Sequence, residues 1–168
     1  TGGAGGIGRA TALLLAEAGA RVVVSDLSES GEETAATIRE RGGQASFVKA
    51  DIGREADVAA LVDETLSIHG RLDGAFNNAG VEQAFLPLHE LTLEQWEHAL
   101  RIDLTGVFLC IKHQVKAMLA GGGGSIVNTA SALGEVAIPR AAEYVAAKHG
   151  VIGLTRAAAL EYGTLGIR

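Results

Sequence analysis

The chain opens with TGGAGGIG, and this glycine cluster is the feature that most constrains its fold. Glycine in bulk costs backbone entropy on folding, so a cluster indicates a backbone that must turn tightly or approach another group closely. Two patterns overlap in it: Gly3, Gly5 and Gly8 satisfy G-x-G-x-x-G, and Gly2, Gly6 and Gly8 satisfy T-G-x-x-x-G-x-G. A helical run follows directly. Such a turn presents free N–H groups and the positive end of the helix to a phosphate.

An acidic residue follows the glycine cluster at a spacing typical of dinucleotide sites. The run RVVVSD predicts a short buried strand that ends at Asp26, 18 residues after Gly8. A carboxylate at this point can accept hydrogen bonds from both adenosine ribose hydroxyls, and it repels the 2′-phosphate of NADP. Taken alone, the motif is also compatible with a glycine turn that binds nothing. Together, the turn, helix, strand and Asp26 predict a dinucleotide site that prefers NAD.

Helical and strand-like segments alternate along the rest of the chain. The predicted strands are 21–26, 44–51, 72–80 and 125–131, and the predicted helices are 8–20, 30–43, 54–70, 92–124 and 141–163. The longest of these helices is expected to adjust near Gly106. Alternating strands and helices imply parallel pairing through right-handed crossovers. The sequence therefore predicts an α/β doubly wound sheet with helices on both faces, in one domain over residues 1–168.

Composition excludes several classes of function. The chain is 48% hydrophobic and carries a formal net charge of −6, with no basic patch that would favour nucleic acid. No apolar run is long enough to span a membrane. The single cysteine, Cys110, permits no internal disulfide and fits a reducing, cytoplasmic compartment. The five histidines form no pattern of metal ligands, so no metal site is predicted.

Residues of two further strand ends belong to the same predicted edge. The second predicted strand ends in Asp51, which Ile52 follows, and the third ends in Asn78, Ala79 and Gly80. Ligands of open α/β sheets bind at the carboxyl ends of the strands. For Asp51 the alternative of capping the next helix stays open, and NNAG could be only a turn.

A second constellation lies near the C-terminus. Tyr144 and Lys148 are four residues apart in a predicted helix, so they share a face. A tyrosine has an ordinary pKa of about 10, and a nearby ammonium stabilises the phenolate and lowers that pKa. Ser131 ends the preceding strand and can hydrogen-bond a substrate oxygen. These three residues are the candidate catalytic set.

The chain resembles the short-chain dehydrogenase/reductase family. The matching stretches are TGGAGGIG, Asp26, ADI, NNAG, SIVNTAS and YVAAK, in the order and spacing of that family. The resemblance implies a Rossmann-type fold and hydride transfer between a nicotinamide cofactor and a secondary alcohol or ketone. Tyr144 would be the general acid/base, Lys148 would bind the nicotinamide ribose and depress the tyrosine pKa, and Ser131 would hold the substrate oxygen. The implied cofactor contacts are Gly2, Gly6, Ile7, Gly8, Asp26, Asp51, Ile52, Asn78, Ala79, Gly80, Tyr144 and Lys148.

One position departs from the family pattern. Asp103 stands where the family usually has an asparagine that supports a water in a proton relay. An aspartate can also hold a water, but it adds a charge and loses the amide donor. Asp103 is therefore kept as a fourth candidate catalytic residue. The alternative is a helix-interior carboxylate bonded to nearby backbone.

The resemblance also bears on the ends of the chain and on alternative functions. We expect the first strand and a C-terminal part of the family fold to be missing, which leaves a gap beside the strand at 21–26. A homodimer or homotetramer is expected for the complete protein. Two alternatives stay open: a catalytically silent nucleotide-binding or sensing protein, and a sugar-nucleotide epimerase or dehydratase, which shares Y-x-x-x-K. The NNAG strand end and the short spacing from Ser131 to Tyr144 favour the reductase.

Overall fold

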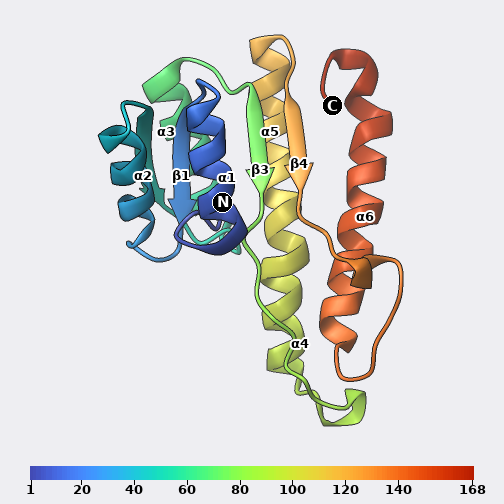
Figure 1. The fold of residues 1–168 in the computed structure, drawn as a ribbon. Helices are drawn as coiled ribbons and strands as arrows, with labels where there is room; N and C mark the ends of the chain where they lie inside the picture. The colour runs from blue at the N-terminus through green and yellow to red at the C-terminus, as the bar shows by residue number, and fades with distance from the viewer.

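The computed structural model describes residues 1–168 and confirms the predicted alternation of strands and helices (Figure 1). The strands are β1 (Arg21–Asp26), β2 (Gln44–Lys49), β3 (Gly74–Asn77) and β4 (Ser125–Asn128). The helices are α1 (Gly6–Glu17), α2 (Gly31–Glu40), α3 (Glu55–His69), α4 (Leu93–Leu100), α5 (Val107–Gly121) and α6 (Ala142–Tyr162). Four short segments complete the order: the 3₁₀ turns η1 (Leu88–Glu90), η3 (Ala132–Gly134) and η4 (Gly163–Leu165), and the π-helical η2 (Arg101–Gly106).

Local chemistry explains where several of these helices begin and end. α4 begins with a capping box, in which Thr92 and Gln95 each accept a hydrogen bond from the other's backbone N–H. The C-cap residues that follow α3 and α5 are Gly70 and Gly122. Both have the left-handed conformation that glycine adopts most easily.

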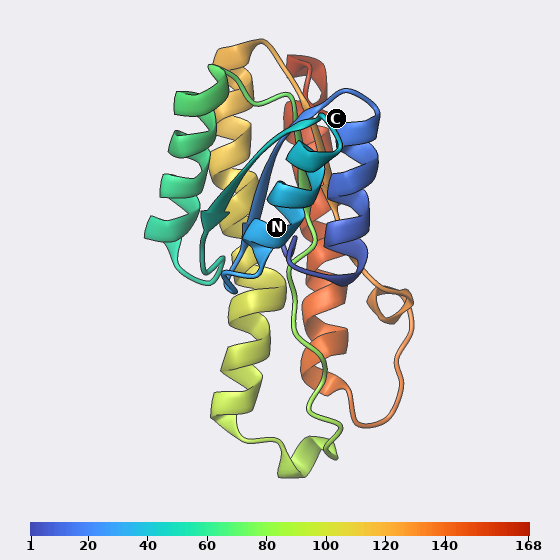
Figure 2. The same cartoon turned by 60° about the vertical axis from the view of Figure 1, so that its left-hand side comes forward.

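The strands form two parallel pairs. β1 pairs with β2, so that Val24 lies opposite Phe47, and β3 pairs with β4, so that Phe76 lies opposite Val127. Figure 2 shows α1 and α2 on one side of the strands and α3, α5 and α6 on the other, and α5 and α6 share one core cluster. This arrangement of parallel strands covered on both faces confirms the predicted α/β class.

A gap separates the two pairs. β1 and β3 exchange no hydrogen bonds, and a cavity of about 780 Å³ lies between them, lined by both strands and by residues of α1 and α3. The predicted gap beside the strand at 21–26 is therefore confirmed. Because unpaired strand edges face it, the cavity carries backbone donors and acceptors on both sides.

The core is built from small aliphatic side chains in three clusters, as the scarcity of aromatic residues leads one to expect. One lies between α5, α6 and β4, one joins α5 to the start of α3, and one joins α1, α2 and β1. Their buried members are, in that order, Val107, Ile111, Val115, Met118, Val151 and Ile167; Ile52, Val58, Ile102, Leu109 and Cys110; and Ala12, Val24, Ala35 and Ile38.

The predicted adjustment in the longest helix is a π-helical turn, η2, between α4 and α5. A Cβ on Gly106 would lie 2.8 Å from Cδ1 of Ile52, so glycine lets η2 approach the segment after β2. Asp103, in the middle of η2, is fully buried. π-helical turns frequently lie at functional sites, because they redirect side chains without ending the helix.

Three predicted strands are shorter in the structure. β3 covers only Gly74–Asn77, and β2 ends at Lys49 and β4 at Asn128, so Asp51 and Ser131 lie in the loops beyond them. Asp51 accepts the backbone N–H of Gly53, and Ser131 caps η3. Short polar side chains compete with ladder hydrogen bonds in this way.

No helix of the structure is both long enough and apolar enough to cross a membrane.

Candidate functional site

The glycine turn lies between β1 and the turn after β3, and its conformation requires glycine. Gly2 has φ +67° and Gly6 has φ +51°, which L side chains rarely adopt. A Cβ on Gly8 would lie only 2.0 Å from the carbonyl oxygen of Gly2. A Cβ on Gly5 would meet nothing within 4 Å, so one side of the turn faces open space. Ile7, next to it, is 64% exposed.

Asp26 is held against this turn by backbone groups. One carboxylate oxygen, Oδ2, accepts a hydrogen bond from the Ala4 N–H at 3.0 Å, and Oδ1 accepts one from the Ser28 N–H at 2.9 Å. The structure therefore brings Asp26 and the glycine turn together, as their spacing predicts. Each oxygen keeps a further lone pair for a donor such as a hydroxyl.

Asp51 and Ile52 lie beyond β2, and their side chains have different surroundings. Asp51 Oδ1 accepts the Gly53 N–H at 2.8 Å, and Oδ2 lies 3.2 Å from Nη1 of Arg101. Asp51 is thus an Asx-turn residue with a salt bridge, and the helix cap of α3 is Arg54 instead. The side chain of Ile52 is buried in the core, so it offers only its backbone to a ligand. The sequence analysis missed Arg101.

The turn after β3 packs directly on the glycine turn. Thr1 Oγ1 accepts the backbone N–H groups of Asn78 and Ala79 at 3.1 and 3.2 Å. A Cβ on Gly2 would lie 2.9 Å from Cα of Ala79. At the other end of this turn, a Cβ on Gly80 would lie 2.5 Å from Asp103 Oδ1. The glycine turn is therefore in contact with the predicted cofactor residues Asn78 and Ala79.

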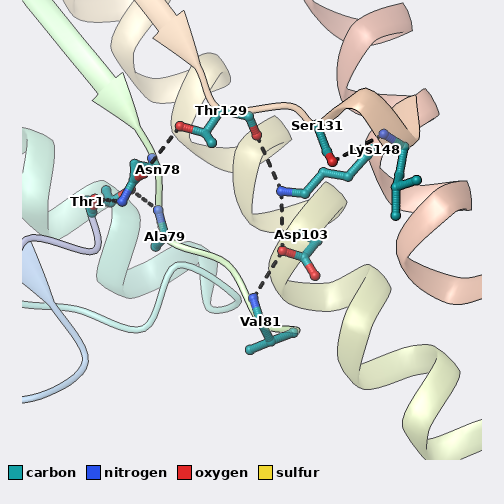
Figure 3. Close-up of polar contacts among 9 residues, drawn as sticks. Thr1, Asn78, Ala79, Val81, Asp103, Thr129, Ser131 and Lys148 are labelled. Carbon is teal, nitrogen blue, oxygen red and sulfur yellow. Dashed lines mark hydrogen bonds and ion pairs between the residues drawn. The ribbon is translucent and has the colours of Figure 1, made fainter. Parts of the chain in front are cut away.

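Lys148 lies at the centre of the second constellation (Figure 3). Its ammonium donates to the carbonyl oxygen of Thr129 at 3.3 Å and lies 3.5 Å from Asp103 Oδ1. It also lies 5.2 Å from the centre of the Tyr144 ring, within reach of a cation–π interaction. The side chain of Lys148 is only 5% exposed, so three segments surround one buried positive charge.

Asp103 is the counter-charge of this lysine. Its Oδ1 also accepts the Val81 N–H at 3.1 Å, whereas Oδ2 is buried and accepts no hydrogen bond from the protein. Burial raises the pKa of Asp103 above its ordinary value, and Lys148 works against that rise. The backbone hydrogen bond agrees with the alternative of a helix-interior carboxylate, and a part for Asp103 in a proton relay stays a prediction.

Ser131 and Tyr144 lie on neighbouring elements. Ser131 Oγ accepts the Leu133 N–H at 3.2 Å, which fixes the side chain at the start of η3. η3 packs closely on α6, since a Cβ on Gly134 would lie 2.8 Å from the Lys148 carbonyl oxygen. Tyr144 lies on α6 and is partly exposed. The structure therefore places the predicted catalytic residues on three elements that meet beyond the ends of β3 and β4.

A buried amide network supports this region, and the sequence analysis missed most of it. Asn77 and Gln114 exchange two hydrogen bonds of 2.9 and 2.7 Å. Asn77 also donates to Asn128 Oδ1, and Asn128 donates to Thr155. The network links β3, β4, α5 and α6. No local pattern marks Gln114 or Thr155, because each stands alone in a helix.

Cys110 is not part of this site. It is 1% exposed, and burial raises the pKa of its thiol to about 11. A thiol with so high a pKa is protonated at neutral pH and is a poor nucleophile. Its place in the core agrees with a small hydrophobic role.

Comparison with known proteins adds independent findings. The model of the family described as short chain dehydrogenase matches residues 1–168. A 2,5-dichloro-2,5-cyclohexadiene-1,4-diol dehydrogenase of Sphingobium indicum is 53% identical over 100% of this chain and 67% of its own length. A cyclohexanol dehydrogenase of Acinetobacter sp. (strain SE19) is 46% identical over the same shares.

A solved structure gives the same result for the fold. The crystal structure of a levodione reductase superimposes with a TM-score of 0.96 at 43% identity, over 99% of this chain and 66% of that one. The chain therefore spans about two thirds of the length of these relatives. With a Rossmann-like fold and a family match along its whole length, the chain belongs to the short-chain dehydrogenase family.

Proposed function

We propose that this protein is an oxidoreductase that transfers a hydride between a nicotinamide cofactor and a secondary alcohol or ketone. The observation that carries the proposal is the buried Lys148 ammonium, held by Thr129 and Asp103 beside the ring of Tyr144. Burying an ammonium is costly unless it is paired and hydrogen-bonded, as Lys148 is here. A cation at this point favours a tyrosine that can give up and take back a proton.

The residues present fit a dinucleotide cofactor. The glycine turn is bare on its open side, where a Cβ on Gly5 or Gly6 would meet no atom of the protein within 4 Å. Asp26 lies at the end of β1 with lone pairs left for ribose hydroxyls. This carboxylate would repel a 2′-phosphate, so we propose NAD as the cofactor, with NADP less favoured.

Each of the candidate catalytic residues has a separate role in the proposed reaction. The cofactor accepts or supplies the hydride. In the oxidative direction Tyr144 takes the hydroxyl proton, and the Lys148 ammonium lies 5.2 Å from the centre of its ring. Ser131 orients the substrate oxygen through its hydroxyl. Asp103 keeps the Lys148 ammonium in place, and its free Oδ2 can pass a proton onward through water.

We further propose that the substrate is an alicyclic secondary alcohol. The relatives named above are dehydrogenases of ring alcohols, and a third, from Sinomonas cyclohexanicum, is a cis-4-hydroxycyclohexanecarboxylate dehydrogenase. The two segments that extend beyond β3 and β4 also expose apolar side chains: Phe85 is 57%, Val136 58% and Ile138 46% exposed. Such side chains suit the apolar body of an alicyclic ring. A homodimer or homotetramer and a cytoplasmic location stay predictions from the sequence.

Two substitutions test the proposal. Tyr144→Phe should reduce kcat for cyclohexanol oxidation by about 10²–10⁴-fold, because it removes the group that takes the proton. NADH binding, measured by fluorescence titration, should stay within about twofold. Asp26→Ala should weaken NADH binding and relax the preference over NADPH, since each lost 1.4 kcal/mol is about tenfold in Kd. Full turnover by Tyr144→Phe would overturn the mechanism and favour a sensing role. If the ratio of the Kd values for NADH and NADPH did not change, Asp26 would not be the residue that selects NAD.

A further inference from the structure

Glu143 is a buried carboxylate that the proposed mechanism does not use. It lies in the first turn of α6, next to Tyr144, and is only 2% exposed. Its Oε1 accepts the backbone N–H of Ala84 at 2.6 Å. Acidic residues are rarely this deeply buried unless they are paired or hydrogen-bonded, so its single partner is informative.

Ala84 lies in the segment 79–87, which joins β3 to η1 and has no regular secondary structure. This segment is held at two points by buried carboxylates. Asp103, on η2, accepts the Val81 N–H at 3.1 Å, and Glu143, on α6, accepts the Ala84 N–H at 2.6 Å. The two carboxylates are the neighbours of the proposed catalytic residues: Asp103 pairs with Lys148, and Glu143 precedes Tyr144.

The segment also carries a strained residue beside the second tether. Phe85 has φ +58°, a conformation that bulky residues adopt only when their surroundings enforce it. Its ring is 57% exposed and therefore does not hold itself in place by burial. The hydrogen bond from the N–H of the preceding residue, Ala84, to Glu143 restrains this part of the backbone. A charged acceptor makes it stronger than a neutral one.

We propose that Glu143 is a positioning residue for the substrate. It ties the segment 79–87 to α6, so that the apolar residues after Ala84 stand beside Tyr144 as one wall of the substrate site. Glu143 does not touch the reacting atoms in this role. It should therefore set the affinity for the substrate and leave the proton and hydride steps unchanged. This proposal rests on the proposed function for its kinetic consequence, but the tether itself does not.

The test compares Glu143→Ala, which removes the acceptor, with Glu143→Gln, which keeps an amide oxygen in the same place. For Glu143→Ala we expect KM for cyclohexanol to rise at least about tenfold, the effect of losing one charge-assisted hydrogen bond. We expect kcat and the Kd for NADH to change by less than about twofold. Glu143→Gln should recover most of the affinity. Glu64→Ala, which removes an exposed carboxylate of α3, is the matched control.

Amide hydrogen exchange tests the tether without turnover. The peptide spanning 79–87 should exchange faster in Glu143→Ala than in the wild type and in Glu143→Gln, whereas peptides of β1 should be unchanged. Equal exchange in all three proteins would overturn the tether. A fall in kcat with unchanged KM, or an equal loss in Glu143→Gln and Glu143→Ala, would overturn the positioning role. If the wild type turned over no alcohol, the proposed function would fail, and exchange alone would decide on the tether.

Discussion

The two halves of the site hold their charged residues by different means. Around β1, Asp26 is partly exposed and takes its hydrogen bonds from Ala4 and Ser28, the second of them two residues away in sequence. Beyond β3 and β4, Asp103 and Lys148 are buried and depend on each other. A pair of exposed charges can lose one member cheaply, whereas a buried pair cannot. The first half is therefore a partly exposed surface, on which the proposed cofactor would lie, and the second is an internal arrangement that the whole fold must support.

Breaking the buried pair should have the largest effect. Asp103→Ala leaves the Lys148 ammonium inside the protein without a counter-charge, and removes the acceptor of the Val81 N–H. We expect the free energy of unfolding to fall by about 3–5 kcal/mol, measured by urea denaturation at neutral pH.

The control lies in the first half of the molecule. Glu17 pairs with Arg41, and both side chains are more than half exposed, at 56% and 57%. Glu17→Ala should change the free energy of unfolding by about 0–1 kcal/mol. If the two variants lost similar stability, the contrast between the halves would be wrong.

Substitutions in the glycine turn should change the affinity of the protein for NADH. Gly8→Ala places a methyl group 2.0 Å from the Gly2 carbonyl oxygen, so the backbone must shift where a pyrophosphate would lie. Forcing an extra methyl group into a filled space costs about 1–3 kcal/mol. We expect the Kd for NADH to rise by about tenfold or more in a fluorescence titration.

Gly5→Ala is the matched control for this change. Gly5 has an extended backbone with φ −160°, and its added Cβ meets no atom of the protein within 4 Å. The free energy of unfolding should therefore stay within about 0.5 kcal/mol of the wild type. If Gly5→Ala weakened NADH binding, the added methyl group would be in contact with the cofactor and not with the protein. Unchanged NADH binding in Gly8→Ala would show that the turn does not receive the cofactor.

The smallest expected effect is a change in the pH dependence of stability. Because the pKa of Asp103 is raised in the folded state, the folded protein binds more protons than the unfolded chain between pH 3.8 and that raised pKa. The free energy of unfolding therefore falls as the pH rises through this window. Asp103→Asn removes this titrating group, so we expect the stability of the variant relative to the wild type to increase as the pH rises above about 4.

This profile is measured by urea denaturation at several pH values. Lys148 and His98 are the charged or titratable groups that favour the ionised carboxylate, and both stay in the variant. Asp63→Asn, at an exposed position of α3, serves as the control and should follow the wild-type profile. A constant difference between Asp103→Asn and the wild type would show that Asp103 titrates as it does in the unfolded chain.

The sequence predicted more of the first half than of the second. The glycine turn, the strand and Asp26 lie within one short stretch, and their geometry follows from backbone freedom and spacing. The same holds for Tyr144 and Lys148, which share a helix face. Ile52 shows the limit, since its position in a motif did not reveal that its side chain is buried in the core. Arg101 and Gln114 were missed because their partners lie far away in sequence.

By itself, the sequence determined the order of the elements, the parallel class of the sheet and the types of residue at the strand ends. Periodicity and turn chemistry act over a few residues, so these features can be read locally. Two contacts of the site could be seen only once the chain was folded: Asp103 faces Lys148, and Glu143 holds Ala84. These contacts join segments that are distant in the chain, and they exist because helices and strands pack in one arrangement that local patterns do not encode.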